Sequence, residues 1–155
     1  EYLALKGFVG NSIPTVDPVK AYRRYQAYHQ AVLAGSVASC HDLSDGGLAV
    51  AAAESAFAGG CGLHLDLSRV LWHGDATGRN DVTLLFSESA SRHLVTVRPD
   101  RRDQFEAIMS GNCFASIGVV TAEPVLAITG LSGSTVVKAG LAELKESWQA
   151  PLREL

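Results

Sequence analysis

The sequence lacks the features that mark secreted, membrane-spanning and nucleic-acid-binding proteins. Its 155 residues include only three cysteines and no Cys-x-x-Cys pair, so we expect reduced thiols in the cytosol. No apolar run approaches the roughly 20 residues that a membrane-spanning helix needs. The 13 basic residues are spread along a chain of formal net charge −3, without a basic stripe. These absences predict a cytoplasmic protein with no nucleic acid and no membrane among its partners.

The sequence does have enough apolar material for one core. It is 47% hydrophobic, and its length suits a single domain over residues 1–155. The chain opens at Glu1 in the apolar stretch EYLALKGFVG, without an initiator methionine. We therefore expect a fragment or a processed piece of a longer protein. The apolar opening stretch would then lie exposed where a neighbouring domain packed, and could drive self-association.

Local patterns predict helices and strands that mix without strict alternation. The clearest helix covers residues 18–34, with Asp17 as N-cap, Pro18 in the first position and Gly35 as the stop. Other helices are predicted over residues 46–58, 100–111 and 141–152. Strands are predicted over residues 36–40, 63–67, 82–89, 93–99, 114–120 and 124–130, the last two as a closing pair. Because several strands follow one another directly, the pattern favours an α+β fold with a mixed sheet covered by helices.

The densest polar chemistry lies in residues 38–60, ASCHDLSDGGLAVAAAESAFAGG. If Ser44 or Asp45 caps the following helix, Gly46 and Gly47 fall in its first turn, where glycine is costly. A ligand would justify two glycines, because they expose backbone N–H groups at a helix N-terminus that attracts phosphate. Close packing of the helix start on a neighbouring element would justify them equally, and the residues alone leave both interpretations open.

The carboxylates in this stretch limit what could bind. Asp42 and Asp45 would repel a bare phosphate, so a ligand here implies a metal, a ribose hydroxyl or a basic group nearby. Arg92 is the residue we expect to supply that positive charge. A hydrolytic triad of Ser44, His41 and Asp42 is excluded because neighbouring strand residues face opposite sides and no Gly-x-Ser-x-Gly elbow is present.

A second polar segment, LFSESASR at residues 85–92, follows a predicted strand. Ser87, Glu88, Ser89 and Arg92 bring together hydroxyl donors, an acceptor and a cation. Such a segment is equally typical of a ligand-binding strand end and of a surface loop. The remaining histidines lack the spacing of a metal site.

Several motifs occur together in the order of a known family. The chain resembles the carboxyl-terminal domain of phosphoribosylformylglycinamidine synthases, within the superfamily of aminoimidazole ribonucleotide synthetase. The resemblance spans nearly the whole chain and rests on EYLALKGFVGN, VASCHDLSDGGLAVAAAESAFAGGCGLHLDL, LLFSESASRHLVTV, IGVV and the ending LKESWQAPL. It implies a three-layer α/β/α domain with a mixed sheet, like the carboxyl-terminal domain of aminoimidazole ribonucleotide synthetase.

The resemblance also implies a chemistry for the full-length enzyme. ATP, with Mg²⁺, activates the amide oxygen of formylglycinamide ribonucleotide, and ammonia from a glutaminase subunit or domain displaces the phosphate. This chain lacks the metal-binding aspartates and the catalytic histidine of the amino-terminal domains, so we expect no catalytic residue here, no metal site and no activity of the isolated domain. The alternatives are the equivalent domain of another ATP-using synthetase or kinase, or a non-catalytic protein-interaction module.

The family pattern places both polar segments at a ligand or at a contact with the remaining synthetase domains. The candidate residues are His41, Asp42, Ser44, Asp45, Gly46, Gly47, Ser87, Glu88, Ser89 and Arg92.

Overall fold

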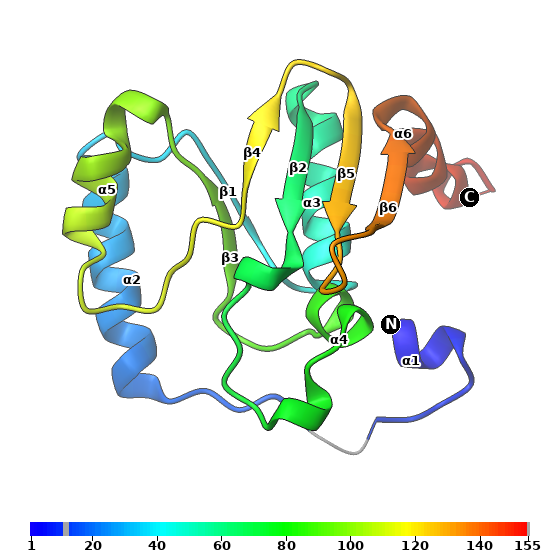
Figure 1. Ribbon diagram of the computed structural model, residues 1–155, viewed down its shortest axis with the longest axis horizontal. Coiled ribbons are helices and arrows are strands. Elements are labelled where there is room, and N and C mark those ends of the chain that lie inside the picture. The colour runs from blue at the N-terminus through cyan, green and yellow to red at the C-terminus, as the bar shows by residue number, and fades with distance from the viewer. Residues whose placement is uncertain (11–12, 155) are drawn as a thin grey trace.

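The computed structural model describes residues 1–10 and 13–154 and confirms a mixed α+β fold (Figure 1). The helices of four or more residues are α1 Tyr2–Leu5, α2 Pro18–Leu33, α3 Gly47–Gly59, α4 Asp81–Phe86, α5 Arg102–Ile108 and α6 Leu141–Gln149, with short 3₁₀ turns between them. The strands are β1 Ser39–Asp42, β2 Gly62–Asp66, β3 His93–Thr96, β4 Gly118–Thr121, β5 Val125–Thr129 and β6 Thr135–Gly140. Within the described part, no helix is long and apolar enough to cross a membrane.

The strands form two separate sheets. A four-stranded sheet has the order β4-β2-β5-β6, in which β2 and β5 run parallel and the other neighbours run antiparallel. A two-stranded sheet pairs β1 with β3 antiparallel, and Asp42 lies opposite His93. The mixed sheet predicted from the sequence is therefore confirmed.

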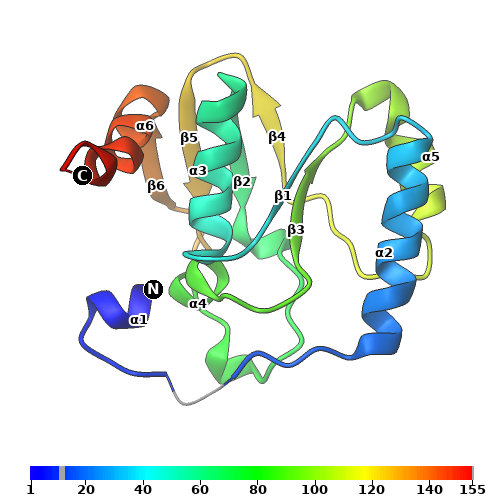
Figure 2. The same cartoon turned by 180° about the vertical axis from the view of Figure 1, so that it is seen from behind.

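Helix α3 lies between the two sheets and carries the main core (Figures 1 and 2). Its Leu48 and Ala52 are buried with Leu63 and Ile128 of the four-stranded sheet and with Leu94 of the small sheet. Because strand residues alternate between faces, Val95 points the other way and packs with the α2 and α5 side of the domain. The small sheet thus has helices on both faces.

The four-stranded sheet has α3 and α6 on one face (Figure 2). On its other face lie His64 of β2 and Val119 of β4, which are paired in the ladder and exposed. That face has none of the described helices packed against it in either view.

The long helix is confirmed almost to the residue. The Asp17 carboxylate accepts hydrogen bonds from the amides of Val19 and Lys20 at 3.0 and 3.1 Å, as an N-cap does. The backbone at Gly35 then adopts a positive φ, just beyond the end of α2.

Two expectations for the other elements are wrong, and one strand was not predicted. Residues 82–89 are not a strand: α4 covers Asp81–Phe86, because Asn80 caps it by accepting a hydrogen bond from the Thr83 amide at 2.9 Å. The two closing strands, β4 and β5, do not pair with each other, since β2 lies between them. Strand β6 pairs with β5 and was not predicted, because its sequence, TVVKAG, follows a glycine-rich turn directly.

Candidate functional site

The polar segment 41–47 runs from the end of β1 into the N-terminus of α3. Gly46 is the N-cap of the helix, with left-handed backbone and no side-chain cap. Neither Ser44 nor Asp45 caps α3, contrary to the prediction. The Ser44 hydroxyl instead donates to the Asp42 carboxylate, and this bond lowers the pKa of Asp42.

The two glycines have a structural reason that the sequence left open. Gly46 and Gly47 have φ values of +76° and +62°, which favour glycine. A Cβ on Gly46 would lie 2.2 Å from a methyl carbon of Val50, and one on Gly47 would lie 2.7 Å from the carbonyl oxygen of Ser87. At Gly47 the start of α3 therefore packs so closely on the end of α4 that only glycine fits, whereas at Gly46 the limit is a side chain of α3 itself.

Two amides at this helix N-terminus, those of Gly46 and Gly47, are already bonded within the chain. The Gly46 N–H donates to Oε1 of Glu88 at 2.8 Å, and the Gly47 N–H donates to the carbonyl of Ser44 at 3.1 Å. The bond from Gly46 lowers the pKa of Glu88, and a second bond from the amino group of Glu1 acts in the same direction. The carboxylate of Glu88 therefore takes up the Gly46 amide, one of the donors at this helix N-terminus that could otherwise bond an anionic ligand.

The segment 87–92 lies against the start of α3, so the structure brings the two predicted polar segments together. Its own side chains are tied to one another: the hydroxyls of Ser87 and Ser89 are 2.7 Å apart, and Nη1 of Arg92 donates to the Ser87 carbonyl at 3.0 Å. Burial lowers the pKa of the Arg92 guanidinium. Arg92 is thus directed at a backbone carbonyl, and not at Asp42 or Asp45 as expected.

A cavity of about 450 Å³ opens beside the N-terminus of α3. Its lining includes Glu1, Asp42, Asp45 and Glu54, and among the described residues of the lining only His41 has a side chain that can carry positive charge. Such a lining repels phosphate and suits hydroxyl groups, amino groups or cations.

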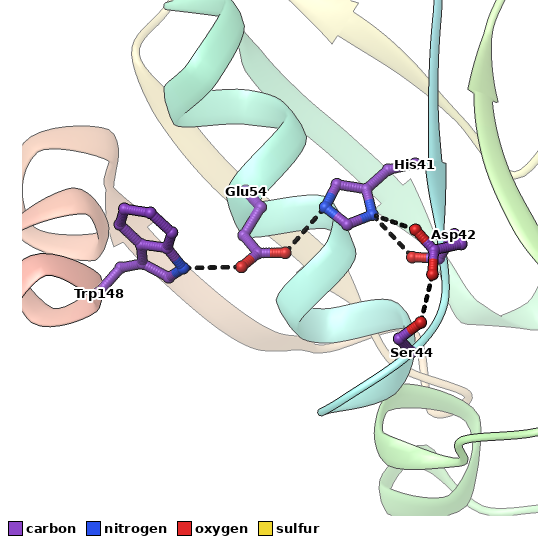
Figure 3. Close-up of polar contacts among 5 residues, drawn as sticks. All are labelled: His41, Asp42, Ser44, Glu54 and Trp148. Atoms are coloured by element: carbon purple, nitrogen blue, oxygen red, sulfur yellow. Dashed lines mark hydrogen bonds and ion pairs between the residues drawn. The ribbon is translucent and has the colours of Figure 1, made fainter.

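A line of hydrogen bonds crosses this cavity wall and joins three elements (Figure 3). Nε2 of His41, on β1, lies 2.8 Å from Oε2 of Glu54, on α3. The other oxygen of Glu54 accepts from the indole N–H of Trp148, on α6, at 2.7 Å. Sequence reasoning missed Glu54 and Trp148, although Glu54 is the one charged residue in the apolar helix α3.

The geometry fits neither a hydrolytic triad nor a metal centre. Ser44 donates to Asp42 and not to the ring of His41, so no hydroxyl is activated by the imidazole. Among residues 1–10 and 13–154, no three His, Cys, Asp or Glu side chains lie close enough together to hold a metal ion.

Comparison with known proteins identifies the family. The model of the AIR synthase related protein, C-terminal domain, matches residues 2–130. The chain belongs to this family. Members of the family that it resembles include phosphoribosylformylglycinamidine synthase subunits, so this is a domain of an enzyme family.

The similar sequences are much longer than this chain. It is 36% identical over 157 residues to the PurL subunit of phosphoribosylformylglycinamidine synthase from Alkaliphilus metalliredigens, covering 99% of this chain and 20% of that protein. It is 34% identical to the PurL subunit of Thermosynechococcus vestitus, and the matched region covers 98% of this chain and 20% of that protein. The chain therefore spans about a fifth of the length of these curated relatives.

Solved structures agree with the AIR synthase-like fold. Thermotoga maritima PurL complexed with FGAR superposes with a TM-score of 0.75 at 25% identity, over 86% of this chain and 22% of that one. Escherichia coli HypE, a hydrogenase maturation protein, superposes with a TM-score of 0.61 over 71% of this chain and 37% of that one. Its identity of 21% supports the shared fold alone.

Replacing Glu88 with glutamine tests whether the negative charge of its carboxylate stabilises the start of α3. We expect a loss of about 1 kcal/mol in the free energy of unfolding at neutral pH, because Gly46 loses a charged acceptor that is partly exposed. The folded-state pKa of Glu88 lies below its ordinary value of 4.5, so its contribution is present above that pH and disappears as the pH falls through the folded pKa. Urea unfolding across this range measures the difference.

At acid pH, the protonated carboxyl group of Glu88 and the amide group of the glutamine variant are both neutral, so the two proteins should become equally stable. An acetylated amino terminus serves as the control, because it removes the bond from Glu1 and keeps the bond from Gly46. A stability difference that does not change with pH would contradict the role of the Glu88 charge.

Proposed function

We propose that this chain is the carboxyl-terminal domain of a longer ATP-dependent synthase that converts formylglycinamide ribonucleotide to formylglycinamidine ribonucleotide in purine biosynthesis. The observation that carries the proposal is 36% identity to a PurL subunit over 99% of the chain. The solved complex of Thermotoga maritima PurL with FGAR supports the same reaction. In this reaction ammonia, supplied by a glutaminase subunit or domain, replaces the amide oxygen after ATP has activated it.

The residues of this chain do not fit the phosphates of ATP by themselves. Glu88 already bonds the Gly46 amide, and the cavity beside it is lined by carboxylates. We therefore derive no step of phosphoryl transfer on this domain, and Mg²⁺ belongs with a nucleotide held elsewhere in the enzyme. Thermotoga maritima PurL has also been solved with ATP and with ADP, which supports ATP as the cofactor of the longer protein.

What the domain contributes is a set of fixed acceptors at a domain boundary. Asp42 and Asp45 are exposed around the cavity, beside the hydroxyl of Ser44. Carboxylates and a hydroxyl accept hydrogen bonds from ribose hydroxyls, or from amide and amino groups of a neighbouring domain. Asp42, Ser44 and Asp45 therefore act in ligand positioning or inter-domain contact, without a catalytic residue.

The opening segment supplies a second contact with partner domains. Leu5, Phe8 and Val9 are 83%, 67% and 97% exposed, so an apolar surface is open to solvent in the chain alone. Neighbouring synthetase domains would cover these side chains in the longer enzyme. In their absence the same surface favours self-association.

Activity assays on two proteins test the function. The 155-residue chain with ATP, ammonia and formylglycinamide ribonucleotide should form amidine at least ~10²-fold more slowly than the complete enzyme, because one domain cannot enclose and orient the reactants. A chimera in which this chain replaces the corresponding fifth of the Alkaliphilus metalliredigens subunit should restore amidine formation.

Turnover by the chain alone would refute the expectation that the isolated domain is inactive. A chimera that folds and binds ATP but does not convert formylglycinamide ribonucleotide would refute the proposed reaction. A matched chimera carrying Asp45→Asn separates the contribution of the cavity from that of overall assembly.

A further inference from the structure

The hydrogen bonds around His41 specify its protonation state. The imidazole ring lies between two oxygen atoms: Nδ1 is 2.7 Å from the backbone carbonyl oxygen of Asp42, and Nε2 is 2.8 Å from Oε2 of Glu54 (Figure 3). A carbonyl oxygen only accepts hydrogen bonds, so Nδ1 must carry a proton. The remaining question is what lies between Nε2 and Glu54.

Trp148 limits the answer. An indole N–H only donates, so Oε1 of Glu54 is an acceptor in the bond from Trp148. A neutral ring with its proton on Nδ1 would present the bare lone pair of Nε2 to Oε2 of a carboxylate. Two lone pairs at 2.8 Å repel, so the pair of His41 and Glu54 holds one more proton than a neutral imidazole beside a carboxylate.

The surroundings place this extra proton on the ring. The side chains of His41 and Glu54 are 32% and 24% exposed, so water reaches the pair and favours its charged form. The titratable residues lining the two cavities around the ring are Glu1, Cys40, Asp42, Asp45, Glu54 and Cys61, and the amino group of Glu1 is itself paired with Glu88. The four carboxylates among them favour a positive ring, because opposite charges nearby stabilise the charged form.

The ring lies at the boundary of two cavities. His41, Glu54 and Trp148 line both the cavity of about 450 Å³ beside the start of α3 and a second cavity of about 790 Å³ that reaches Phe57 and Leu63. A group that enters from either side therefore meets the same proton.

We propose that His41 is an imidazolium held by the carboxylate of Glu54, and that Trp148 is the positioning residue that fixes which oxygen of Glu54 faces the ring. The pair is a site for one exchangeable proton in a carboxylate-lined cavity. A ligand with an amino group or a positive charge competes with that proton for Glu54, whereas a phosphate does not. This inference goes beyond the proposed function, because it concerns only hydrogen bonds within this chain.

Nitrogen-15 NMR of the histidine rings tests the assignment on the 155-residue chain. Both ring nitrogens of His41 should show protonated chemical shifts. The resonances are assigned by their loss in a His41→Gln variant. A carbon-13 shift of the Glu54 carboxyl group should report a carboxylate.

Glu54→Gln gives the decisive comparison, because it keeps every hydrogen bond. Trp148 then donates to the amide oxygen of the new glutamine, the amide NH₂ donates to Nε2, and Nδ1 donates to Asp42. We expect the ring to lose one proton and become the neutral Nδ1–H tautomer, with the backbone amide spectrum otherwise unchanged.

Two further variants isolate the role of Trp148. Trp148→Phe alone should leave the ring doubly protonated, since Glu54 still accepts. Adding Glu54→Gln to Trp148→Phe should leave the proton on Nδ1, because Nδ1 still donates to the Asp42 carbonyl, but it removes the donor that holds the glutamine amide in one orientation. The side-chain amide resonances of that glutamine should therefore broaden in the double variant relative to Glu54→Gln alone, and unchanged resonances would overturn the positioning role of Trp148.

The proton assignment is overturned by a neutral His41 ring in the unsubstituted chain, whether Glu54 is then a carboxylate or a neutral acid. It is also overturned if Glu54→Gln keeps both ring nitrogens protonated. A failure of the PurL-type chimera to make amidine leaves these NMR outcomes unaffected, so the two proposals fail separately.

Discussion

Replacing Gly47 with alanine is expected to lower the free energy of unfolding by roughly 3–5 kcal/mol and to leave little folded domain at 37 °C. The new Cβ would lie 2.7 Å from the carbonyl oxygen of Ser87 and 2.9 Å from that of Leu85. Both are backbone atoms at the end of α4, so they cannot move aside without shifting that helix. A φ of +62° adds the cost of a left-handed alanine. Thermal and urea unfolding followed by circular dichroism measure the loss.

Gly60→Ala is the matched control. Gly60 has a φ of +65° at the other end of α3, and a Cβ there would meet nothing within 4 Å. The substitution should lower the free energy of unfolding by roughly 1–2 kcal/mol, which is the cost of an alanine in the left-handed conformation. Equal losses for the two variants would show that α3 does not pack against α4 as tightly as described, and would leave the glycine pair without its structural explanation.

The sequence predicted best those features that local chemistry decides. Asp17, Pro18 and Gly35 mark both ends of α2, because caps and stops act within a few residues. The alternation around Leu63 and Leu65 predicted β2 for the same reason: the strand has one buried face and one exposed face. The α+β class and the resemblance to the synthase family followed from such patterns and are confirmed by the fold and by the family match.

Features set by long-range contacts could not be predicted from the sequence. The apolar run at residues 82–86 fits a strand or a short buried helix equally, and the cap from Asn80 decides for the helix. The bond from Gly46 to Glu88 joins residues 42 apart in the sequence, so only the packed structure shows that the helix N-terminus is occupied.

The same limit explains the errors around the candidate site. Arg92 was expected to neutralise Asp42 and Asp45, but its guanidinium bonds the Ser87 carbonyl nearby. His41 lines the cavity instead, and its Nε2 is 2.8 Å from Oε2 of Glu54 on α3. The available signal was Glu54, a single glutamate in an apolar helix, since a charged residue in such a position usually has a polar partner. The sequence does not show which residue that partner is.

Replacing Ile128 with alanine should cost roughly 2–5 kcal/mol, because it removes a fully buried side chain from the face of the sheet that packs on α3. The side chain is 0% exposed, and rigid strand neighbours on both sides limit how far the cavity can collapse. The measurement is the urea midpoint of the 155-residue chain, with the m-value checked for two-state behaviour.

Val119→Ala on β4 is the control from the opposite face of the same sheet. Val119 is 62% exposed, so its loss should change the stability of the isolated chain by less than about 0.5 kcal/mol. In the longer enzyme of the proposed function, a neighbouring domain that packs on this open face would make the same substitution costly. If Val119→Ala destabilises the isolated chain as much as Ile128→Ala does, then the open face is already covered in solution, and self-association of the 155-residue chain is the explanation to test by sedimentation.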